Sequence, residues 1–210
     1  KYVTEKLGTD EVINTLYWEG FSPEDIPFDT LPQQFVIKVT HGSTFNIIVK
    51  NKDEIDINAI IKQLNIWLKA KFIPCYGEWW YGKVKPRIIV EKYLENADKG
   101  ELVDYKVFCF NGEPKLIDVH TGRFGRHCRN IYDLGWNFLD DVYFKYPHSE
   151  QIEKPKMLKQ LLEYARKLSA DFSHVRVDFF IVDDKLYFSE LTFANGAGFD
   201  PITPEEFDIE

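Results

Sequence analysis

Two acidic residues stand in the middle of two strand-like runs near the end of the chain. The segment VRVDFFIVDDKLYFSELTF covers residues 175–193 and carries Asp178 in its first run and Glu190 in its second. Large apolar side chains surround both acids, where a carboxylate is costly unless a partner accompanies it. The segment therefore predicts a site at which two carboxylates hold something positively charged.

The two runs are predicted to form a hairpin that brings these acids together. Side chains alternate between the two faces of a strand. A three-residue loop, 183–185, sets Val182 opposite Leu186 and Asp178 opposite Glu190, with Cβ atoms about 4.5–5.5 Å apart. The predicted faces contain Arg176, Asp178 and Phe180 on the first strand, and Leu186, Phe188, Glu190 and Thr192 on the second.

Like charges directly opposite each other destabilise a sheet, so we expect a cation between the two carboxylates. Arg176 is one candidate. A divalent cation such as Mg²⁺, which prefers hard oxygen ligands, is the other. A solvated face with scattered acids is the alternative to both. Exposed like charges cost little, so neutralising both acids is expected to leave the metal-free protein as stable as the parent.

The rest of the chain is expected to alternate between hairpins and amphipathic helices. Apolar residues at helical spacing predict helices over 56–72, with Asp56 as N-cap, and over about 156–171. Residues 19–34 hold three prolines and are predicted as a loop, and 124–153 as irregular chain. Besides the hairpin of paired acids, strands are predicted at 35–39, 46–50, 87–94, 102–110 and 114–119.

Hairpins separated by helices indicate an α+β fold rather than a doubly wound parallel sheet. The order β-β-α-β, then β-β-α-β-β, predicts two α+β subdomains with antiparallel sheets and a cleft between them. We expect residues 1–30 to be a linker or the end of a preceding region. Residues 31–95 would form the first subdomain with a hinge, and 96–210 the second.

The composition is typical of a soluble globular protein. Hydrophobic residues make up 44% of the chain and charged residues 29%. A net charge of −8 argues against nucleic acid as a partner. No apolar run approaches the roughly 20 residues of a membrane helix, and no signal peptide is apparent. Cys75, Cys109 and Cys128 lack a CxxC spacing and predict reduced thiols in a cytoplasmic protein. Zinc binding by His120, His127 and Cys128 would fit no common spacing.

The order R-x-D…E-x-T followed by a glycine-containing loop resembles the metal-binding hairpin of ATP-grasp ligases such as D-alanine–D-alanine ligase. Four motifs occur in the right order over nearly the whole chain: LPQQFVIKVTHGS, RIIVEKYLE, DYKVFCFNGEPK and VRVDFF…YFSELTF. Together they resemble the TupA-like ATP-grasp family, which is named for a protein of teichuronopeptide synthesis and tends to occur with surface-polysaccharide genes. The resemblance implies an ATP-grasp fold whose cleft holds the nucleotide.

The resemblance implies that one strand and the loop after it bind the phosphates. Lys38 ends an apolar strand and, in the family pattern, reaches the nucleotide phosphates. The alternative is a lysine that snorkels at a sheet edge. His41, Gly42 and Ser43 would close over the phosphates, since glycine lets backbone N–H groups approach an anion. Taken alone, these three residues would be an ordinary turn.

The resemblance also implies a hinge that binds adenine. Glu91 would take the exocyclic amine, although a plain surface acid is the alternative. Backbone groups can bind adenine only where the ladder is interrupted, so the next residues contribute mainly by position. These are Lys92, Tyr93 and Leu94. Asp104 aligns with an acid that often binds ribose, and Lys106 on the same strand face is a candidate ion-pair partner for it.

The hairpin of paired acids would carry the chemistry. Arg176 would sit beside the transferred phosphate, because a planar guanidinium matches two phosphate oxygens. Asp178 and Glu190 would hold Mg²⁺. Thr192 stands where the family usually has asparagine, and a hydroxyl is a weaker magnesium ligand than an amide oxygen. Lys1 resembles the lysine of a D-K pair in related ligases.

The implied reaction is ATP- and Mg²⁺-dependent joining of a carboxylate and an amine through an acyl phosphate. Backbone N–H groups of Gly196 and Gly198 would hold reacting oxygens, and Arg123, Arg126 and Arg129 would clamp an acidic substrate or simply be solvated. The leading expectation is a ligase that joins an amino acid to a uronic acid or a growing peptide in a capsule or other surface polymer. The alternatives are a phosphotransferase acting on a sugar or glycan hydroxyl, and a catalytically silent nucleotide-binding module.

Overall fold

The computed structural model describes residues 1–70, 82–98, 102–122, 125–198 and 200–209. The chain forms two compact units, each with its own sheet and core. One unit is continuous and comprises residues 14–94. The other is made of residues 1–13 together with 95–210. We call them the small unit and the large unit.

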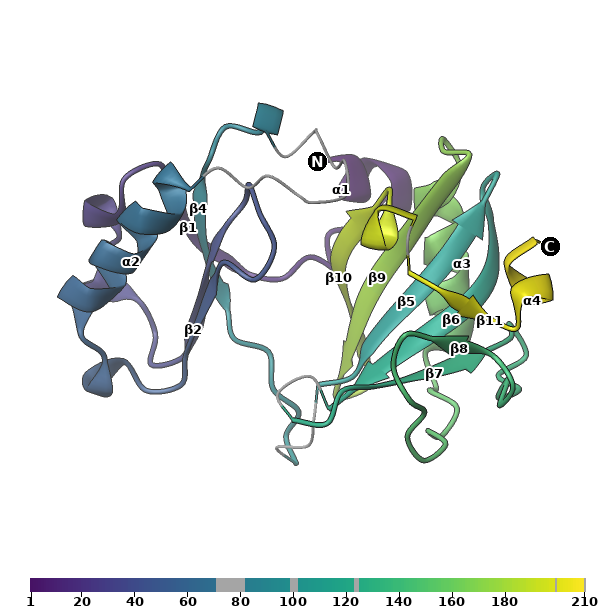
Figure 1. Cartoon of the computed structure of the whole chain (residues 1–210). Coiled ribbons are helices and arrows are strands. Elements are labelled where there is room, and N and C mark those ends of the chain that lie inside the picture. Colours follow the sequence, from purple (N-terminus) through teal and green to yellow (C-terminus); the bar gives the residue numbers. More distant parts are fainter. Residues whose placement is uncertain (71–81, 99–101, 123–124, 199, 210) are drawn as a thin grey trace. The chain divides into compact units, whose positions relative to one another are not determined.

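The small unit is a four-stranded antiparallel sheet backed by one helix (Figure 1). The strand order is β1-β4-β2-β3, which makes β2 and β4 the central strands. Short 3₁₀ turns occur at 23–25, 28–30 and 52–54. The elements are β1 (Leu16–Gly20), β2 (Phe35–Val39), β3 (Asn46–Val49), α2 (Ile57–Lys69) and β4 (Ile88–Lys92).

Alternation along β2 explains how this sheet packs. Phe35, Ile37 and Val39 are buried in the small unit's core, while Val36 and Lys38 between them face the other side and are only partly covered. Helix α2 packs Ile60 and Leu64 into the same core. The Asp56 side chain accepts a hydrogen bond from Ala59 N at 3.0 Å, which confirms the predicted N-cap.

The large unit is built on a five-stranded antiparallel sheet in the order β10-β9-β5-β6-β7. Helices α1 (Tyr2–Leu7) and α3 (Leu158–Ser169) pack together, and α3 contacts β5, β6 and β9. The core between α3 and the sheet includes Val107, Val119 and Val177, all fully buried. The strands are β5 (Asp104–Phe110), β6 (Glu113–Thr121), β7 (Cys128–Tyr132), β9 (His174–Val182) and β10 (Lys185–Thr192).

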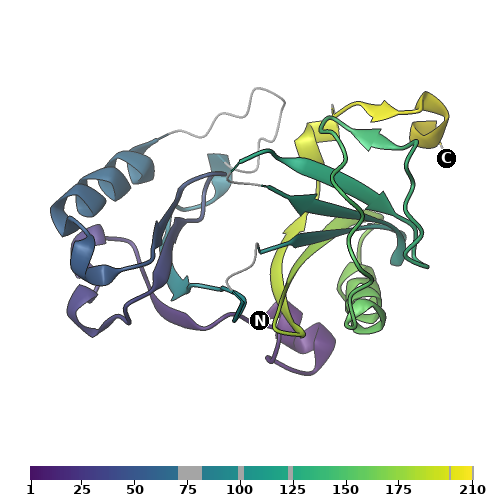
Figure 2. The same cartoon turned by 90° about the horizontal axis from the view of Figure 1, so that it is seen from below.

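The opposite face of this sheet is only partly covered. Strands β8 (Tyr143–Phe144) and β11 (Ile202–Thr203) pair with each other, and α4 (Glu205–Ile209) follows them. They lie across the sheet from α3 (Figure 2). Their small apolar cluster contains Phe108, Leu116, Ile131, Val142 and Phe144. The remainder of this face carries polar and charged side chains.

The hairpin β9–β10 differs from its predicted register in two ways that cancel. The turn has two residues, Asp183 and Asp184, with positive φ values of 48° and 59°, as hairpin turns of this length require. Val182 therefore pairs with Lys185. A β-bulge at Ser189 then adds one residue to β10. The three-residue loop was therefore wrong, but Asp178 does pair with Glu190 as predicted.

The bulge also corrects the predicted face of β10. Leu186 and Phe188 before it pack into the core, and so does Leu191 after it. Because the extra residue reverses the alternation, Glu190 and Thr192 point to the opposite side from Leu186. The expectation that these four polar and apolar side chains share one face was wrong.

Other differences lie in the segments predicted as irregular. The segment 1–30 is not a linker, because it contributes α1 to the large unit and β1 to the small one. The region 124–153 contains β7 and β8. The mixed helices and antiparallel sheets confirm the α+β class. No helix in the described part of the chain has the length and apolarity to cross a membrane.

Candidate active site

A continuous group of charged side chains lies on the open face of the large unit's sheet. Strand alternation explains its position. Every second side chain of β5, β6 and β9 points into the apolar core, and the side chains between them point to this face. Most members are nevertheless buried by their neighbours on this face. The group, here called the polar face, contains Asp104, Lys106, Asp118, His120, Arg129, Arg176, Asp178, Glu190 and Thr192.

Asp178 is at the centre of the polar face and is fully buried. Its carboxylate accepts a 2.5 Å hydrogen bond from Lys106 Nζ and two from Arg176, at 2.8 and 2.7 Å. Burial alone would raise the pKa of Asp178, but the charges of Lys106 and Arg176 outweigh it and hold the pKa below its usual range. Asp178 is therefore an ionised carboxylate between two cations.

Glu190 lies across from Asp178 with a side chain that is 58% exposed. Arg176 Nη2 is 2.7 Å from Asp178 Oδ2 and 3.5 Å from Glu190 Oε1, so a cation does lie between the acids, as the sequence predicted. Thr192 Oγ1 accepts from Arg176 and donates to Glu190. Although Glu190 is more than half exposed, desolvation of its carboxylate and the charge of Asp178 raise its pKa.

A second buried acid, Asp118, lies on β6 beside Lys106 of β5. Arg129 donates to it three times, with the shortest contact at 2.5 Å from Nη2 to Oδ2. His120 Nε2 lies 2.9 Å from the same carboxylate, and His127 Nε2 lies 3.0 Å from His120 Nδ1. Four side chains thus form one hydrogen-bonded chain.

The electrostatics of this chain favour a neutral His120. Burial lowers the pKa of His120, against the opposing effect of Asp118. Burial would raise the pKa of Asp118, but its hydrogen bond to His120 and the charge of Arg129 lower it to about 2. Because His120 is neutral near pH 7, Arg129 is the cation that keeps Asp118 ionised, and His120 contributes through its hydrogen bond.

The oxygen atoms around Glu190 have the chemistry that magnesium prefers. Two carboxylates face each other across the hairpin, and the Thr192 hydroxyl bonds to one of them. Mg²⁺ commonly uses one or two carboxylates together with phosphate oxygens. No group of three His, Cys, Asp or Glu side chains among the described residues could hold a metal ion by itself. The donor set therefore fits a metal that is held partly by a ligand's phosphates.

In the small unit, Lys38 and Glu91 form an ion pair on the sheet face opposite α2. Lys38 is on β2, which is a central strand, so it is not a lysine at a sheet edge. Its side chain is 40% exposed, compared with 18% for Glu91. The two residues predicted to bind different parts of the nucleotide are therefore neighbours.

The loop from Thr40 to Phe45 contains the three residues predicted to cover the phosphates. Gly42 is half-buried and Ser43 is exposed. His41, however, is only 4% exposed, with Nε2 3.1 Å from the carbonyl oxygen of Ala70. His41 therefore packs into the small unit instead of standing at the tip of the loop.

The predicted hinge begins where the β4 ladder ends. Lys92 is the last residue of β4, and both its backbone groups are used: N–H donates to Thr15 O, and C=O accepts from Asn14. Tyr93 and Leu94 lie beyond the strand and are half-buried. Residues 93 and 94 therefore lie beyond the ladder, where the predicted backbone pairing with adenine needs them. The backbone groups of Lys92 are already hydrogen-bonded.

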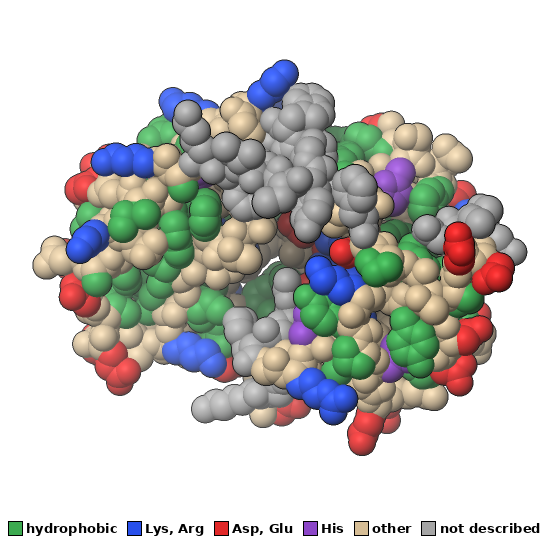
Figure 3. Space-filling view, viewed as in Figure 1, with side chains coloured by type: hydrophobic (Ala, Val, Ile, Leu, Met, Phe, Trp, Pro, Cys, Tyr) green, Lys and Arg blue, Asp and Glu red, His purple; other side chains and the backbone are tan. Residues whose placement is uncertain are grey.

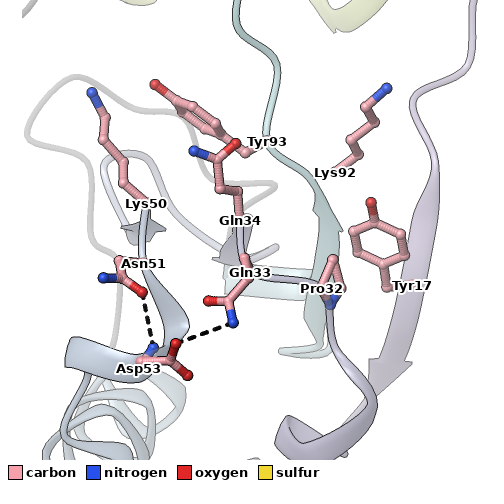
Figure 4. Close-up of a pocket in the computed structure, with 9 residues that line it drawn as sticks. All are labelled: Tyr17, Pro32, Gln33, Gln34, Lys50, Asn51, Asp53, Lys92 and Tyr93. Atoms are coloured by element: carbon pink, nitrogen blue, oxygen red, sulfur yellow. Dashed lines mark hydrogen bonds between the residues drawn. The ribbon is translucent and has the colours of Figure 1, made fainter.

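The small unit also has an open pocket of about 480 Å³ (Figure 4). Two hydrogen bonds connect residues of its lining. The backbone N–H of Asp53 donates to the Asn51 side chain, and the Gln33 side chain donates to the Asp53 carboxylate. Lys38 and Glu91 do not line this pocket, so it is distinct from the predicted phosphate site. Its lining residues are Tyr17, Pro32, Gln33, Gln34, Lys50, Asn51, Asp53, Lys92 and Tyr93.

Two predicted roles do not match the observed positions. Asp104 is 1% exposed and its carboxylate is 2.9 Å from Lys106 Nζ, so it is the buried ion partner of Lys106, not an acid presented to ribose. Arg129 is 4% exposed and bound to Asp118, so it is neither solvated nor available as a substrate clamp. Arg123 lies outside the described residues, and Arg126 is exposed.

The glycine loop after β10 is close to the polar face. Gly196 and Gly198 have positive φ (53° and 79°) in a 3₁₀ turn. A Cβ atom on Gly196 would lie 2.6 Å from Asp200 Cγ, so the Asp200 side chain would have to move, and the positive φ also favours glycine there. Asp200 in turn lies 3.7 Å from Arg129.

Sequence reasoning missed that Lys106, Asp118 and His120 join the paired acids. The available signal was alternation, since Asp104 and Lys106 in one strand, and Asp118 and His120 in the next, interrupt apolar runs at a spacing of two.

The zinc hypothesis named His120, His127 and Cys128. The two histidine rings bond directly to each other. Cys128 is a buried free thiol, as is Cys109. Cys75 lies outside the described residues. The contact between the rings thus joins the histidines to Asp118 instead of leaving both free for a metal.

A two-unit α+β protein with an acid-paired hairpin in one unit and a lysine on a central strand of the other has the features of an ATP-grasp fold. The profile of the family described as TupA-like ATPgrasp matches residues 1–210. The chain therefore belongs to the TupA-like ATP-grasp family. A sequence search of curated proteins found no match.

Solved structures confirm the predicted fold. D-alanine–D-alanine ligase from Bacillus anthracis is 21% identical, with a TM-score of 0.53 over 91% of this chain and 54% of the other. L-amino acid ligase from Bacillus licheniformis is 13% identical, with a TM-score of 0.55 over 93% of this chain and 42% of the other. The chain thus spans about half the length of the solved proteins that it matches.

Charged side chains of both signs are mixed on the part of the surface that Figure 3 shows. On the face seen in Figure 3, the described Lys and Arg side chains are scattered among acidic ones and do not gather in a single patch.

Proposed function

We propose that this protein is an ATP- and Mg²⁺-dependent carboxylate–amine ligase that forms an amide through an acyl phosphate. The observation that carries the proposal is the hairpin arrangement in which Arg176 lies between the opposed carboxylates of Asp178 and Glu190. Membership in an ATP-grasp family supports it. This arrangement combines a guanidinium for phosphate oxygens with carboxylates for a divalent cation.

The large unit would supply the groups around the transferred phosphate. Asp178 positions Arg176 through two hydrogen bonds, so the guanidinium is held in one orientation before a phosphate arrives. Such preorganised charge stabilises a developing anion at little reorganisation cost. Asp178, Glu190 and Thr192 would hold Mg²⁺, which when bound neutralises phosphate charge.

The small unit would supply the groups for the rest of the nucleotide. Lys38 and Glu91 form an ion pair that is partly exposed, so it can exchange at modest cost for contacts to ATP. Lys38 would then turn to the phosphates and Glu91 to the adenine amine. The backbone of Tyr93 and Leu94 lies beyond the β4 ladder and would pair with adenine.

The substrates we propose are an amino acid as amine and a uronic acid or growing peptide as carboxylate. The proposed setting is the synthesis of capsule or another cell-surface polysaccharide, on the cytoplasmic side. The support is the resemblance of this chain to a family that tends to occur with surface-polysaccharide genes.

A product screen tests the reaction class. The protein is incubated with ATP, Mg²⁺, amino acids and uronic acids, and both the products and the nucleotide are read by mass spectrometry. Amide, ADP and inorganic phosphate in equal amounts are expected. A phosphorylated sugar without amide would replace the ligase by a phosphotransferase. Bound ATP without turnover would indicate a nucleotide-binding module.

A lysine variant tests the phosphate site. Lys38→Ala removes a side chain that is 40% exposed and outside the core, so the melting transition should be kept. Affinity for ATP should fall by about 10-fold or more, since a charge-assisted hydrogen bond contributes about 1.5–3 kcal/mol. Lys62→Ala, on the exposed surface of α2, is the control and should bind ATP like the parent. Loss of the melting transition in Lys38→Ala would show a structural role.

A further inference from the structure

Lys106 is a buried cation of the polar face, and the nucleotide chemistry proposed above does not use it. Its side chain is 6% exposed, and its strand β5 lies between β9 and β6. Asp178 on β9 and Asp118 on β6 are its direct cross-strand partners. Asp104 lies two residues away on β5 itself. One ammonium group is thus placed among three acidic residues.

Two of these acids share the Lys106 ammonium group. Nζ lies 2.5 Å from Asp178 Oδ2 and 2.9 Å from Asp104 Oδ2. Only 0% and 1% of these two acidic side chains are exposed, so their charges depend on protein groups for stabilisation. Because it also contacts Asp104, Lys106 can give up its contact to Asp178 without becoming an unpaired buried charge.

Asp178 Oδ2 is the oxygen that faces the second acid of the hairpin. Arg176 Nη2 lies 2.7 Å from this oxygen and 3.5 Å from Glu190 Oε1, so the two oxygens flank one nitrogen atom. The same nitrogen donates to Thr192 Oγ1. A metal held jointly by these side chains would therefore bind to Oδ2 of Asp178.

The contact from Lys106 falls on this same oxygen. Asp178 Oδ2 accepts hydrogen bonds from Lys106 Nζ and Arg176 Nη2, while Oδ1 accepts one from Arg176 Nε. A carboxylate oxygen has two lone-pair sites, so both sites of Oδ2 are taken. Positive charges also repel each other strongly where water is excluded. One of the two cations therefore has to leave Oδ2 before a metal can bind there.

Lys106 is the cation that can leave. It donates one hydrogen bond to Asp178, whereas Arg176 donates two from different nitrogen atoms. Lys106 also keeps a second carboxylate at 2.9 Å, while the other acid beside Arg176 is Glu190 at 3.5 Å. Arg176 is moreover the residue proposed to meet the transferred phosphate. Displacing Lys106 thus breaks fewer contacts than displacing Arg176.

We infer that Lys106 takes the metal's place at Asp178 in the free protein and shifts toward Asp104 when Mg²⁺ and ATP bind; this rests on the proposed Mg²⁺-dependent function. Asp178 stays ionised and in place in both states, held first by an ammonium group and then by the metal. No group of three His, Cys, Asp or Glu side chains in the described segments could hold the ion alone, so phosphates supply further oxygens. Lys106 is thus a positioning residue that opposes binding of a divalent ion before the nucleotide.

Binding of Mn²⁺ without a nucleotide tests the inference, with electron paramagnetic resonance to separate free from bound ion. Lys106→Met keeps an unbranched side chain and removes the ammonium group. This variant should bind Mn²⁺ about 10-fold more tightly than the parent, because a charge-assisted hydrogen bond no longer competes with the metal. Lys185→Met makes the same change at an exposed position of β10 and should bind like the parent. Parental or weaker affinity in folded Lys106→Met would overturn the inference.

Crystal structures of the parent test the movement without any substitution. Crystals grown with Mn²⁺ and the non-hydrolysable analogue AMP-PNP should show the metal on Asp178 Oδ2. The distance from Lys106 Nζ to this oxygen should increase from 2.5 Å to beyond about 3.5 Å, the limit of a hydrogen bond, and the contact to Asp104 should remain. A metal-bound structure in which Lys106 still donates to Asp178 Oδ2 would overturn the inference, whatever the stability of Lys106→Met.

Failure of this exchange can be told apart from failure of the proposed ligase function. A parent that shows the exchange with Mn²⁺ and AMP-PNP but makes no amide would overturn the ligase function and leave the role of Lys106 in place. A parent that binds no Mn²⁺ even with AMP-PNP would overturn the exchange together with the proposed metal site.

Discussion

At the scale of single residues, the two paired acids have opposite environments. Asp178 is fully buried between Lys106 and Arg176, and its pKa is lowered. Glu190 is 58% exposed, and its pKa is raised. Neighbouring carboxylates whose pKa values are pushed apart are typical of sites with divided roles. We therefore expect Asp178 to fix the geometry of Arg176 and Glu190 to adapt to a bound ligand.

The first prediction separates these two roles by stability. Asp178→Asn leaves Lys106 and Arg176 buried without their shared counter-ion, so the free energy of unfolding should fall by about 3 kcal/mol. Glu190→Gln removes an exposed charge with a raised pKa and should leave stability equal or slightly higher. Urea unfolding of the ligand-free proteins measures both values. Equal stability of the two variants would mean that Asp178 is not needed to balance its cations.

This outcome revises an expectation drawn from the sequence. Neutralising both acids was expected to leave the metal-free protein as stable as the parent, on the assumption that both are exposed. The structure contradicts that assumption for Asp178, which is fully buried and ion-paired. The double variant should therefore lose about as much stability as Asp178→Asn alone.

The second prediction concerns acid. Asp118 has a pKa of about 2 in the folded protein and 3.8 as an ordinary side chain. The unfolded state thus binds more protons between these values, so stability contributed by Asp118 is present above about pH 4 and is lost as the pH falls toward 2. The contribution is about 2 kcal/mol. Asp118→Asn should be less stable at pH 6 but should lose less on acidification, measured by urea unfolding at several pH values.

The difference in acid dependence between the parent and Asp118→Asn measures the effect of Asp118 without that of Glu190. Glu190 has a raised pKa, so its protonation favours the folded state and acts in the opposite direction. Its effect is common to both proteins and cancels in the difference. Identical acid dependence in parent and Asp118→Asn would contradict the assignment of Asp118 as a strongly ionised buried acid.

At the scale of elements, the β-bulge in β10 decides which side chains meet. Ser189 is the extra residue, and it is exposed. If Ser189 were paired in the ladder instead of bulged, Glu190 and Thr192 would follow the alternation of Leu186 and Phe188 toward the core. The bulge therefore reverses the alternation, so that Leu186 and Phe188 before it face the core while Glu190 and Thr192 after it belong to the polar face.

The third prediction follows from that bulge. Deleting Ser189 should remove the bulge and keep the register, because Phe188–Phe179 and Glu190–Asp178 are already consecutive pairs of the ladder. Glu190 and Thr192 then stay on the polar face and Leu186 and Phe188 stay in the core, so ATP turnover should be kept and the melting temperature should stay close to that of the parent. Ser189→Ala keeps the extra residue and is the control, with an expected change within about 0.5 kcal/mol. Loss of turnover in the deletion variant would show that the bulged residue does more than set the register.

At the scale of the whole molecule, the large unit is assembled from two separated parts of the chain. Residues 1–13 complete a unit otherwise formed by 95–210. Val3 and Val12 belong to its core, and Val12 O accepts a hydrogen bond from Phe188 N at 2.8 Å. Tyr2 also donates to the carbonyl oxygen of Leu168 at the end of α3. The first residues are thus part of the unit that carries the paired acids.

The fourth prediction tests this assembly. Removing residues 1–13 exposes the surfaces covered by Val3 and Val12, each of which contributes about 1.5–3 kcal/mol by burial. Hydrogen exchange should accelerate in α3 and β10 of the large unit and remain parental in α2 of the small unit. Glu5→Ala, at an exposed position of α1, is the control and should exchange like the parent. Parental exchange in the truncated protein would show that the segment is dispensable.

The sequence by itself determined much of the local structure. The apolar run at 35–39 predicted β2, and helical spacing together with an Asp56 cap predicted α2. These features depend on neighbouring residues, so local patterns are sufficient. The motif order also indicated the ATP-grasp family, because the chain retains several short motifs at the expected places.

The tertiary structure decided the rest, because burial and partners depend on residues far apart in the chain. The hairpin pairing of Asp178 with Glu190 was predicted from a loop length that was wrong, and a bulge that no local pattern announced restored it. Asp104 and Arg129 look in sequence like exposed ligands for a nucleotide or substrate. Each is buried against an opposite charge: Lys106 lies two residues along the same strand as Asp104, and β6 places Asp118 beside Arg129. Whether a charged side chain faces a ligand or a counter-ion is set by its burial and its neighbours on the sheet face, which only the folded sheet defines.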